Sequence, residues 1–183
     1  MRLGRCNLGF VVLTAATLLS AGCYSNTVTA GDQAAKTLTR GTCITTEDAD
    51  RLADEVLQLI NLERSAADLN LSPVTASPRL RSIAEQYACR MIEGAFFDHT
   101  DPITGRGPGD RAVAGKYRFY AIGENLAAGP ATAAEAVKAW MESPSHRAII
   151  LDPRWTEVGI GLRSGGDYGI YWVQLFGLPA SDL

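Results

Sequence analysis

The fold of this chain is decided by the stretch Tyr168-Gly169-Ile170-Tyr171-Trp172-Val173-Gln174-Leu175-Phe176. Successive side chains of a β-strand point to opposite faces. Both faces of this stretch carry large apolar side chains, with Ile170, Trp172 and Phe176 on one and Tyr171, Val173 and Leu175 on the other. A strand that is apolar on both faces is covered on both sides. The sequence therefore predicts a sheet between two layers.

A second strand precedes this one and pairs with it as a hairpin. Residues 157–163 alternate apolar residues with Gly159 and Gly161, and residues 164–167, Ser-Gly-Gly-Asp, have the composition of a tight turn. Glycines inside a strand indicate that another element packs closely on that face. A third strand is predicted over residues 117–122, and it leads into a Gly-Glu-Asn-Leu turn.

Three helices are predicted as the cover for the sheet. The first begins at Thr46, is followed by acidic residues and repeats apolar residues at helical spacing to about Ala67. The second runs from Ser77-Pro78 to Gly94, and the third from Thr132 to Pro144. The Gly- and Pro-rich segment 98–117 predicts a long loop. We expect an α+β fold, a three-layer α-β-α sandwich with a small, three- to four-stranded antiparallel sheet.

The N-terminal residues predict export. Arg2 and Arg5 precede an apolar run over residues 8–19 that is too short to cross a bilayer as a helix. The run ends in Leu-Ser-Ala-Gly before Cys23, which resembles a bacterial lipoprotein cleavage site. We therefore expect a signal peptide over residues 1–22 and a lipid on Cys23. Ordinary secretion is the alternative, because Ser20 stands where an apolar residue is usual.

The mature chain is expected to consist of a tether and one domain. Residues 23–44 are rich in Thr, Ala and Gly without periodicity, which is typical of a tether, and the domain is predicted over residues 45–183. The net charge of −3 becomes about −5 once Arg2 and Arg5 are removed with the signal peptide. A mildly acidic chain without a Lys/Arg cluster argues against a nucleic-acid partner.

Two cysteines remain in the exported chain once Cys6 and Cys23 are set aside, namely Cys43 and Cys89. Cys89 lies nine residues after Leu80 of the apolar stripe, on the opposite and polar face of its helix. Free cysteines are usually buried, so a cysteine on the polar face of an exported protein is better explained by pairing. We expect a Cys43–Cys89 disulfide, with two free thiols as the alternative.

The polar residues that could form a site lie in three segments. The chain has only two histidines, which lie in Phe97-Asp98-His99-Thr100 and in Ser143-Pro144-Ser145-His146-Arg147. Between them in sequence lies Gly123-Glu124-Asn125-Leu126. We interpret the three segments as walls of one cavity, lined by His99, Glu124, Asn125, Ser143 and His146.

Five motifs, taken in order, resemble those of a known family. They are Asn61-Leu62-Glu63-Arg64, Phe97-x-His99-Thr100, Gly123-Glu124-Asn125-Leu126, Trp140-Met141-Glu142-Ser143-Pro144-Ser145-His146-Arg147 and Trp172-x-x-x-Phe176-Gly177. Over about residues 50–178 the chain resembles the bacterial branch of the CAP superfamily, which includes the SCP-like, cysteine-rich secretory, antigen 5 and pathogenesis-related 1 proteins. Asn61 and Arg64 belong to the first motif, and we expect them to have a structural role.

The resemblance implies an α-β-α sandwich with a cavity lined by two histidines and two acids. His99, Glu124 and His146 occupy three of these positions. The fourth position, an acid in animal members of the family, is Ser143 here, with Glu142 one place earlier. This chain therefore departs from the four-residue set. Members of the family are also reported to bind lipids and sterols.

The three remaining site residues allow more than one chemistry. Two imidazoles and a carboxylate form a ligand set for zinc or another divalent cation, and also an acid/base set. The simpler alternative is that Glu124 accepts hydrogen bonds that brace the surrounding loops. Ser143 and Ser145 lie near His146 in sequence but without the Gly-x-Ser-x-Gly motif of a serine nucleophile. No cofactor is required by this interpretation.

Three functions follow from these features. We expect a non-enzymatic, monomeric binding module of the cell envelope that holds an apolar, lipid or peptide ligand and is anchored in the membrane through the lipid on Cys23. The first alternative is a metal-dependent hydrolase that acts on envelope polymer or protein. The second is a structural or adhesive surface protein with a vestigial cavity. The sequence does not name the ligand.

Overall fold

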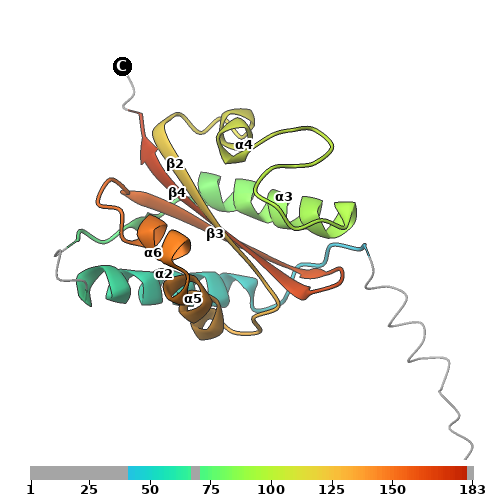
Figure 1. The fold of residues 1–183 in the computed structure, drawn as a ribbon, viewed down its shortest axis with the longest axis horizontal. Coiled ribbons are helices and arrows are strands. Elements are labelled where there is room, and N and C mark those ends of the chain that lie inside the picture. Colours follow the sequence, from blue (N-terminus) through green and yellow to red (C-terminus); the bar gives the residue numbers. More distant parts are fainter. Residues whose placement is uncertain (1–40, 67–70, 181–183) are drawn as a thin grey trace, which may run out of the picture.

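A four-stranded sheet divides the molecule into two helical layers (Figure 1). The computed structural model describes residues 41–66 and 71–180. The strands are β1 (Thr75–Ala76), β2 (Phe119–Ala128), β3 (Glu157–Gly165) and β4 (Gly169–Pro179). They lie in the order β1-β3-β4-β2, in which β4 pairs antiparallel with β3 and with β2, and β1 pairs parallel with β3. The predicted sandwich is confirmed, with a sheet that is mostly antiparallel.

The helices are α2 (Ala49–Ala66), α3 (Pro78–Gly94), α4 (Pro108–Ala114), α5 (Ala133–Glu142) and α6 (Pro144–Ile150). Side chains of α2, α5 and α6 share one hydrophobic cluster, and side chains of α3 and α4 share the other. The two groups lie on opposite sides of the sheet (Figure 1). Within the described ranges, none of these helices has the length and apolar content needed to cross a membrane.

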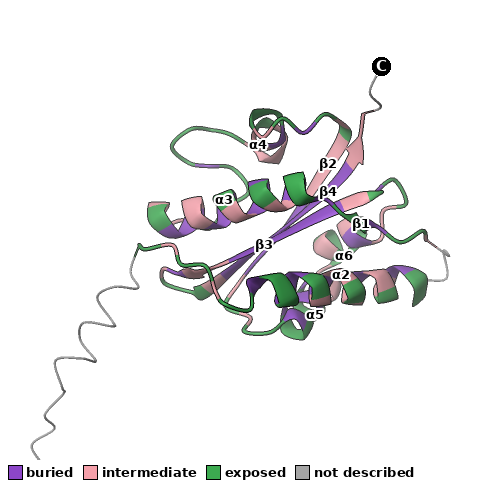
Figure 2. Cartoon of the chain, turned by 180° about the vertical axis from the view of Figure 1, so that it is seen from behind, coloured by how far each residue is buried: buried purple, intermediate pink, exposed green. Residues whose placement is uncertain are grey.

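Strand β4 supplies both cores, as its sequence predicts. Trp172 and Phe176 pack with the α2, α5 and α6 layer, whereas Tyr171, Val173 and Leu175 pack with the α3 and α4 layer. All five side chains are buried, and Figure 2 shows β3 and β4 coloured as buried over most of their length. Burying apolar area on two faces of a single strand favours association of both helical layers with it.

The two glycines of β3 allow α3 to approach the sheet. A Cβ atom at Gly159 would lie 2.2 Å from the backbone of Leu80 and Arg81, and one at Gly161 would lie 2.4 Å from the backbone nitrogen of Glu85. Both distances are too short for a real side chain. The close packing expected from the glycine alternation is therefore confirmed.

Two local predictions were wrong, and one short helix was not predicted. The Gly-Glu-Asn-Leu segment is no turn: it lies inside β2, where Glu124 is opposite Leu175 and Asn125 is opposite Gln174. The segment 98–117 is not a continuous loop, because α4 begins at Pro108 within it. The third helix is confirmed as α5, which ends before Pro144. The helix that was not predicted is α6, which Pro144 starts, since proline fits the first turn of a helix.

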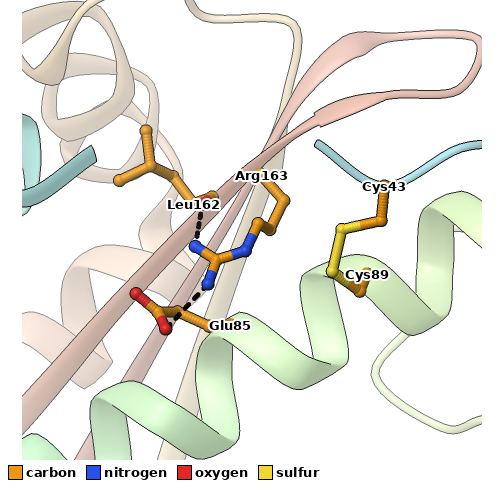
Figure 3. The surroundings of a disulfide bond; sticks show 5 residues. All are labelled: Cys43, Glu85, Cys89, Leu162 and Arg163. Carbon is orange, nitrogen blue, oxygen red and sulfur yellow. Dashed lines mark hydrogen bonds and ion pairs between the residues drawn. A yellow bond between two sulfur atoms is a disulfide. The ribbon is translucent and has the colours of Figure 1, made fainter. Parts of the chain in front are cut away.

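The last residues of the predicted tether are attached to the domain. Cys43 forms a disulfide with Cys89 of α3, with 5.1 Å between the Cα atoms (Figure 3). Ile44 exchanges two backbone hydrogen bonds with Ser164, of 2.8 and 2.9 Å. The disulfide prediction is therefore confirmed. The predicted signal peptide 1–22 and the predicted lipidation site Cys23 lie outside the described residues.

Breaking the disulfide is expected to lower the free energy of unfolding by about 4 kcal/mol, because the bond closes a long loop in the unfolded chain. The two cysteines are 46 residues apart in sequence. Urea unfolding of the double variant Cys43→Ser/Cys89→Ser, compared with the unmodified chain, measures the difference. The unmodified chain with a reductant should approach the value of the variant. Equal stability of variant and unmodified chain under oxidising conditions would contradict the prediction.

Gly161→Ala is expected to lower the free energy of unfolding by about 1–3 kcal/mol, since the new methyl group has to displace the backbone of α3. Gly107→Ala is the control. A Cβ atom there meets nothing closer than 3.9 Å and φ is −87°, so only the lower preference of alanine for the N-cap of α4 remains, and its effect should stay below about 1 kcal/mol. Chemical unfolding of both variants gives the comparison, and a Gly161→Ala variant as stable as the control would rule out the tight contact.

Candidate functional site

Glu124 is the centre of the polar cluster. It projects from β2 toward the α3 and α4 layer, and only 1% of its side chain is exposed. One carboxylate oxygen lies 2.9 Å from Nδ1 of His99, and the other accepts a hydrogen bond of 2.5 Å from Arg111. A carboxylate this deeply buried has to be compensated by hydrogen bonds and opposite charge. Both of its oxygens are used in this way.

Arg111, on α4, is the partner that the sequence did not reveal. Besides Glu124, its guanidinium donates to the backbone oxygens of His99 (2.9 Å) and Arg106 (3.1 Å). Its central carbon lies 3.3 Å from the centroid of the Tyr87 ring, a cation–π contact. Tyr87 in turn donates from its hydroxyl to the backbone oxygen of Asp98 (2.6 Å). Arg111 therefore joins α3, α4, β2 and the segment that carries His99.

His99 is held by Glu124 but remains half-exposed, with 49% of its side chain accessible. The hydrogen bond to Glu124 raises the pKa of His99 above its ordinary value, against the opposing effect of partial burial. Since Nδ1 faces the carboxylate, it carries the hydrogen, and Nε2 has no hydrogen-bond partner among residues 41–66 and 71–180. The imidazole is thus fixed at one nitrogen and available at the other.

His146 reaches the cluster from the opposite layer. Asn125 follows Glu124 in β2, so its side chain points to the other face of the sheet. There it donates to the backbone oxygen of His146 on α6 (3.2 Å) and to the side-chain oxygen of Gln174 (2.9 Å). Burial, and then the nearby charge of His99, lower the pKa of His146. Since β2 is an edge strand of the described sheet, the residues on its two faces both lie at that edge.

Asn61 and Arg64 lie apart from the histidines and hold the end of α2. Arg64 is fully buried and donates to the backbone oxygens of Ser72, Ile150 and Asp152, at 2.7 to 3.0 Å. The Asn61 side chain forms two hydrogen bonds with the backbone of Val74. These contacts connect α2 to the segment before β1 and to the end of α6, which is a structural role.

A comparison with known families decides what kind of domain this is. Residues 57–176 match the CAP model, described as the cysteine-rich secretory protein family. The chain belongs to this family. The resemblance seen in the five sequence motifs is thereby confirmed.

Similar proteins are found among bacteria. YkwD of Bacillus subtilis is 34% identical over 122 residues, which are 67% of this chain and 45% of YkwD. A solved extracellular protein containing an SCP domain from Bacillus anthracis is 27% identical, with a TM-score of 0.64 over 73% of this chain and 44% of that one. A solved outer surface protein from Borrelia burgdorferi is 26% identical, with a TM-score of 0.66 over 76% of this chain and 99% of that one. The chain thus matches less than half the length of the two Bacillus proteins.

The metal-ligand set expected for this CAP domain is not assembled in the described part of the chain. Among the residues that the structure describes, no three His, Cys, Asp or Glu side chains are placed to hold a metal ion. The second oxygen of Glu124 faces the Arg111 guanidinium, whose positive charge opposes a cation at that position. The hydroxyl groups of Ser143 and Ser145 form a hydrogen bond with each other, with 3.2 Å between their oxygens. The expected cavity residues are therefore only partly joined: His99 contacts Glu124, and the backbone of His146 contacts Asn125.

The two histidines are expected to titrate on opposite sides of the ordinary imidazole pKa of about 6.5. The pKa of His99 is raised, so its contribution to stability is complete below about pH 6.5 and is lost as the pH rises through the folded value. The pKa of His146 is lowered, so its contribution is complete above about pH 6.5 and is lost as the pH falls through the folded value.

An NMR titration of the two imidazole C–H signals measures both pKa values, because the chain has no other histidine. Glu124→Gln should shift the midpoint of His99 downward by removing the carboxylate. Glu142→Gln is the control, since that exposed glutamate pairs only with Lys138 among the described residues. Two coincident midpoints in the unmodified chain would contradict the assignment, even if Glu124→Gln does not fold.

Proposed function

We propose that this CAP domain is an exported binding module of the cell envelope, with an apolar or peptide ligand held beside His99. The observation that carries the proposal is the burial of Glu124 and its hydrogen bonding. Its carboxylate is buried and both of its oxygens are engaged, by His99 and by Arg111. A carboxylate of this kind fixes the tautomer and the orientation of the imidazole, and leaves Nε2 to face a ligand.

The same observation argues against Glu124 as the general base of a hydrolase. A general base needs a free lone pair within hydrogen-bond reach of the proton that it removes. Glu124 already accepts hydrogen bonds from His99 and Arg111, and only 1% of its side chain is exposed, so water has little access to its remaining lone pairs. Ser143 and Ser145 bond to each other, and neither has a hydrogen bond to a histidine in the described part of the chain. Neither serine is activated as a nucleophile.

An aromatic cluster near His99 offers a surface for such a ligand. Phe97, two residues before His99, lies 5.9 Å from Tyr168 and 6.1 Å from Tyr171 between ring centroids, and the two tyrosine rings are 5.7 Å apart. Phe97 is 40% exposed and Tyr168 56% exposed. Exposed aromatic rings close to a fixed hydrogen-bonding group are typical of surfaces that bind apolar groups or peptides.

Binding is tested by identifying what co-purifies with the full chain from its native cells by mass spectrometry. The double variant Phe97→Ala/His99→Ala should lose the ligand, whereas Leu62→Ala, an exposed apolar residue on α2 in the other layer, should retain it. Equal recovery of the ligand with both variants would overturn the location of the site. Hydrolysis of envelope polymer or protein that Glu124→Gln abolishes would overturn the binding function itself.

A divalent cation is the competing occupant of the same site. Because Arg111 holds the second oxygen of Glu124, we expect no tight zinc binding by the purified chain at neutral pH. Calorimetric titration with zinc measures this, with His99→Ala and His146→Ala as controls. Tight binding that either substitution abolishes would establish the metal site instead.

Export and anchoring through Cys23 complete the proposal. The support is the basic and apolar N-terminus, a disulfide that requires an oxidising compartment, and relatives described as extracellular or as an outer surface protein. We expect the unmodified protein to partition into detergent and Cys23→Ser to release it into the aqueous phase. Cys6→Ser, within the predicted signal peptide, is the matched control and should leave partitioning unchanged. Recovery of the unmodified protein from the medium without detergent would contradict anchoring.

A further inference from the structure

A cavity next to Arg111 is lined by residues other than those of the His99 site. It measures about 340 Å³, is open to solvent, and is lined by α3, by the loop that leads to α4 and by α4 itself. Neither His99 nor Glu124 lines it. Figure 1 shows this loop on the same side of the sheet as α3 and α4. We call this cavity the α3–α4 pocket and define it by Ile83, Tyr87, Arg90, Asp101, Arg106 and Ala114.

The charged groups of the α3–α4 pocket do not balance. Its lining contains three guanidinium groups, those of Arg90, Arg106 and Arg111, and one carboxylate, that of Asp101. Arg90 donates to both oxygens of Asp101, at 2.7 and 3.4 Å. Arg111 is paired with Glu124 behind the pocket. Within the described part of the chain, the positive charge on Arg106 therefore remains uncompensated.

Asp101 is unavailable to Arg106 because its hydrogen-bonding capacity is used by other groups. Besides Arg90, it accepts from the backbone N–H groups of Ile103 (2.8 Å) and Thr104 (3.0 Å), and its side chain is 6% exposed. The Arg106 guanidinium has no ion-pair or hydrogen-bond partner in the described ranges 41–66 and 71–180. It is an exposed side chain at the rim of the pocket.

The backbone of Arg106 is nevertheless held in place. Its carbonyl oxygen accepts from the Arg111 guanidinium (3.1 Å) and from the backbone N–H of Asp101 (3.1 Å). The loop thus presents the guanidinium from a fixed position. The lining also includes the apolar residues Ile83 and Ala114 and the aromatic residue Tyr87. The pocket combines an unpaired guanidinium at its rim with an apolar wall.

We propose that the α3–α4 pocket binds a small monoanion, a carboxylate carried on an apolar or aromatic group such as the C-terminal residue of a peptide. The planar guanidinium of Arg106 has the geometry to donate two parallel hydrogen bonds to a carboxylate. The apolar group lies against Ile83 and Ala114. The volume is at the lower end of that of ligand pockets, which suits a group of about the size of one amino acid. This site goes beyond the proposed function, because it does not use His99 and stands if the His99 site binds nothing.

The test compares two probes that differ only in charge, N-acetyl-phenylalanine and N-acetyl-phenylalanine amide. Each is titrated into the exported chain at fixed ionic strength and followed by amide NMR shifts. We expect the acid to bind with shifts centred on α3, α4 and the loop between them, and the amide to bind at least about tenfold more weakly. Equal affinity for the two probes would overturn the proposal.

Arg106→Gln should weaken binding of the acid by about tenfold or more. Arg147→Gln is the matched control, because it removes the same charge from an exposed arginine on α6 in the other layer, and it should leave the affinity unchanged. Ala114→Phe, at an exposed position of the lining, should block the pocket without a core substitution. Unchanged binding by Arg106→Gln or by Ala114→Phe would overturn the site.

Two further titrations distinguish the α3–α4 pocket from a simple anion site and from the His99 site. Sodium acetate tests the apolar wall: if acetate binds as tightly as N-acetyl-phenylalanine, the pocket is a simple anion site and the proposed ligand class is wrong. His99→Ala tests independence from the His99 site, and it should leave the affinity for the acid unchanged. Loss of binding in His99→Ala would place the probe in the His99 site and overturn the inference.

Discussion

The ion pair between Glu124 and Arg111 is the interaction on which the polar half of the structure depends. A buried carboxylate is costly unless its partners are close and well aligned. Here one carboxylate fixes Arg111 on α4 and His99 on the preceding loop, and Arg111 then fixes the backbone of that loop at His99 and Arg106. The position of α4, the orientation of the imidazole and the rim of the α3–α4 pocket all follow from this pair. Removing either partner alone would leave the other charge buried and unpaired.

The longer strands and helices were predictable because their apolar residues recur at a regular spacing in the sequence. The two apolar faces of residues 168–176 predicted a sheet covered on both sides, and the glycines of β3 predicted close packing against a helix. The polar position of Cys89 predicted its disulfide. Each of these inferences uses the spacing of residues in the sequence, which determines the face of a strand or helix on which a side chain lies.

The shortest elements and the polar part of β2 were not predictable, because no such regular spacing marks them. Strand β1 has two residues and α4 has seven, which is too few to show a period. Glu124 and Asn125 are polar residues within β2, so the strand resembled a turn. The two side chains point to opposite layers because both residues lie in β2, which continues past the predicted end of that strand. Arg111 could not be recognised as the partner of Glu124, because 13 residues and a change from helix to strand separate them. The sequence thus indicated the histidines and Glu124, but not the guanidinium that determines what the carboxylate can do.

The disulfide also determines how the domain responds to mechanical tension. Cys43 is bonded to Cys89 in the middle of α3, and Ile44 pairs with Ser164 immediately after it. A pulling force applied to the chain before residue 43 passes through a covalent bond into α3. The sequence between the two cysteines, including α2 and β1, is then outside the stretched path. Helix α3 also lines the α3–α4 pocket, so a load between the N-terminus and a ligand bound there would pass through α3, α4 and the loop between them, all on one side of the sheet.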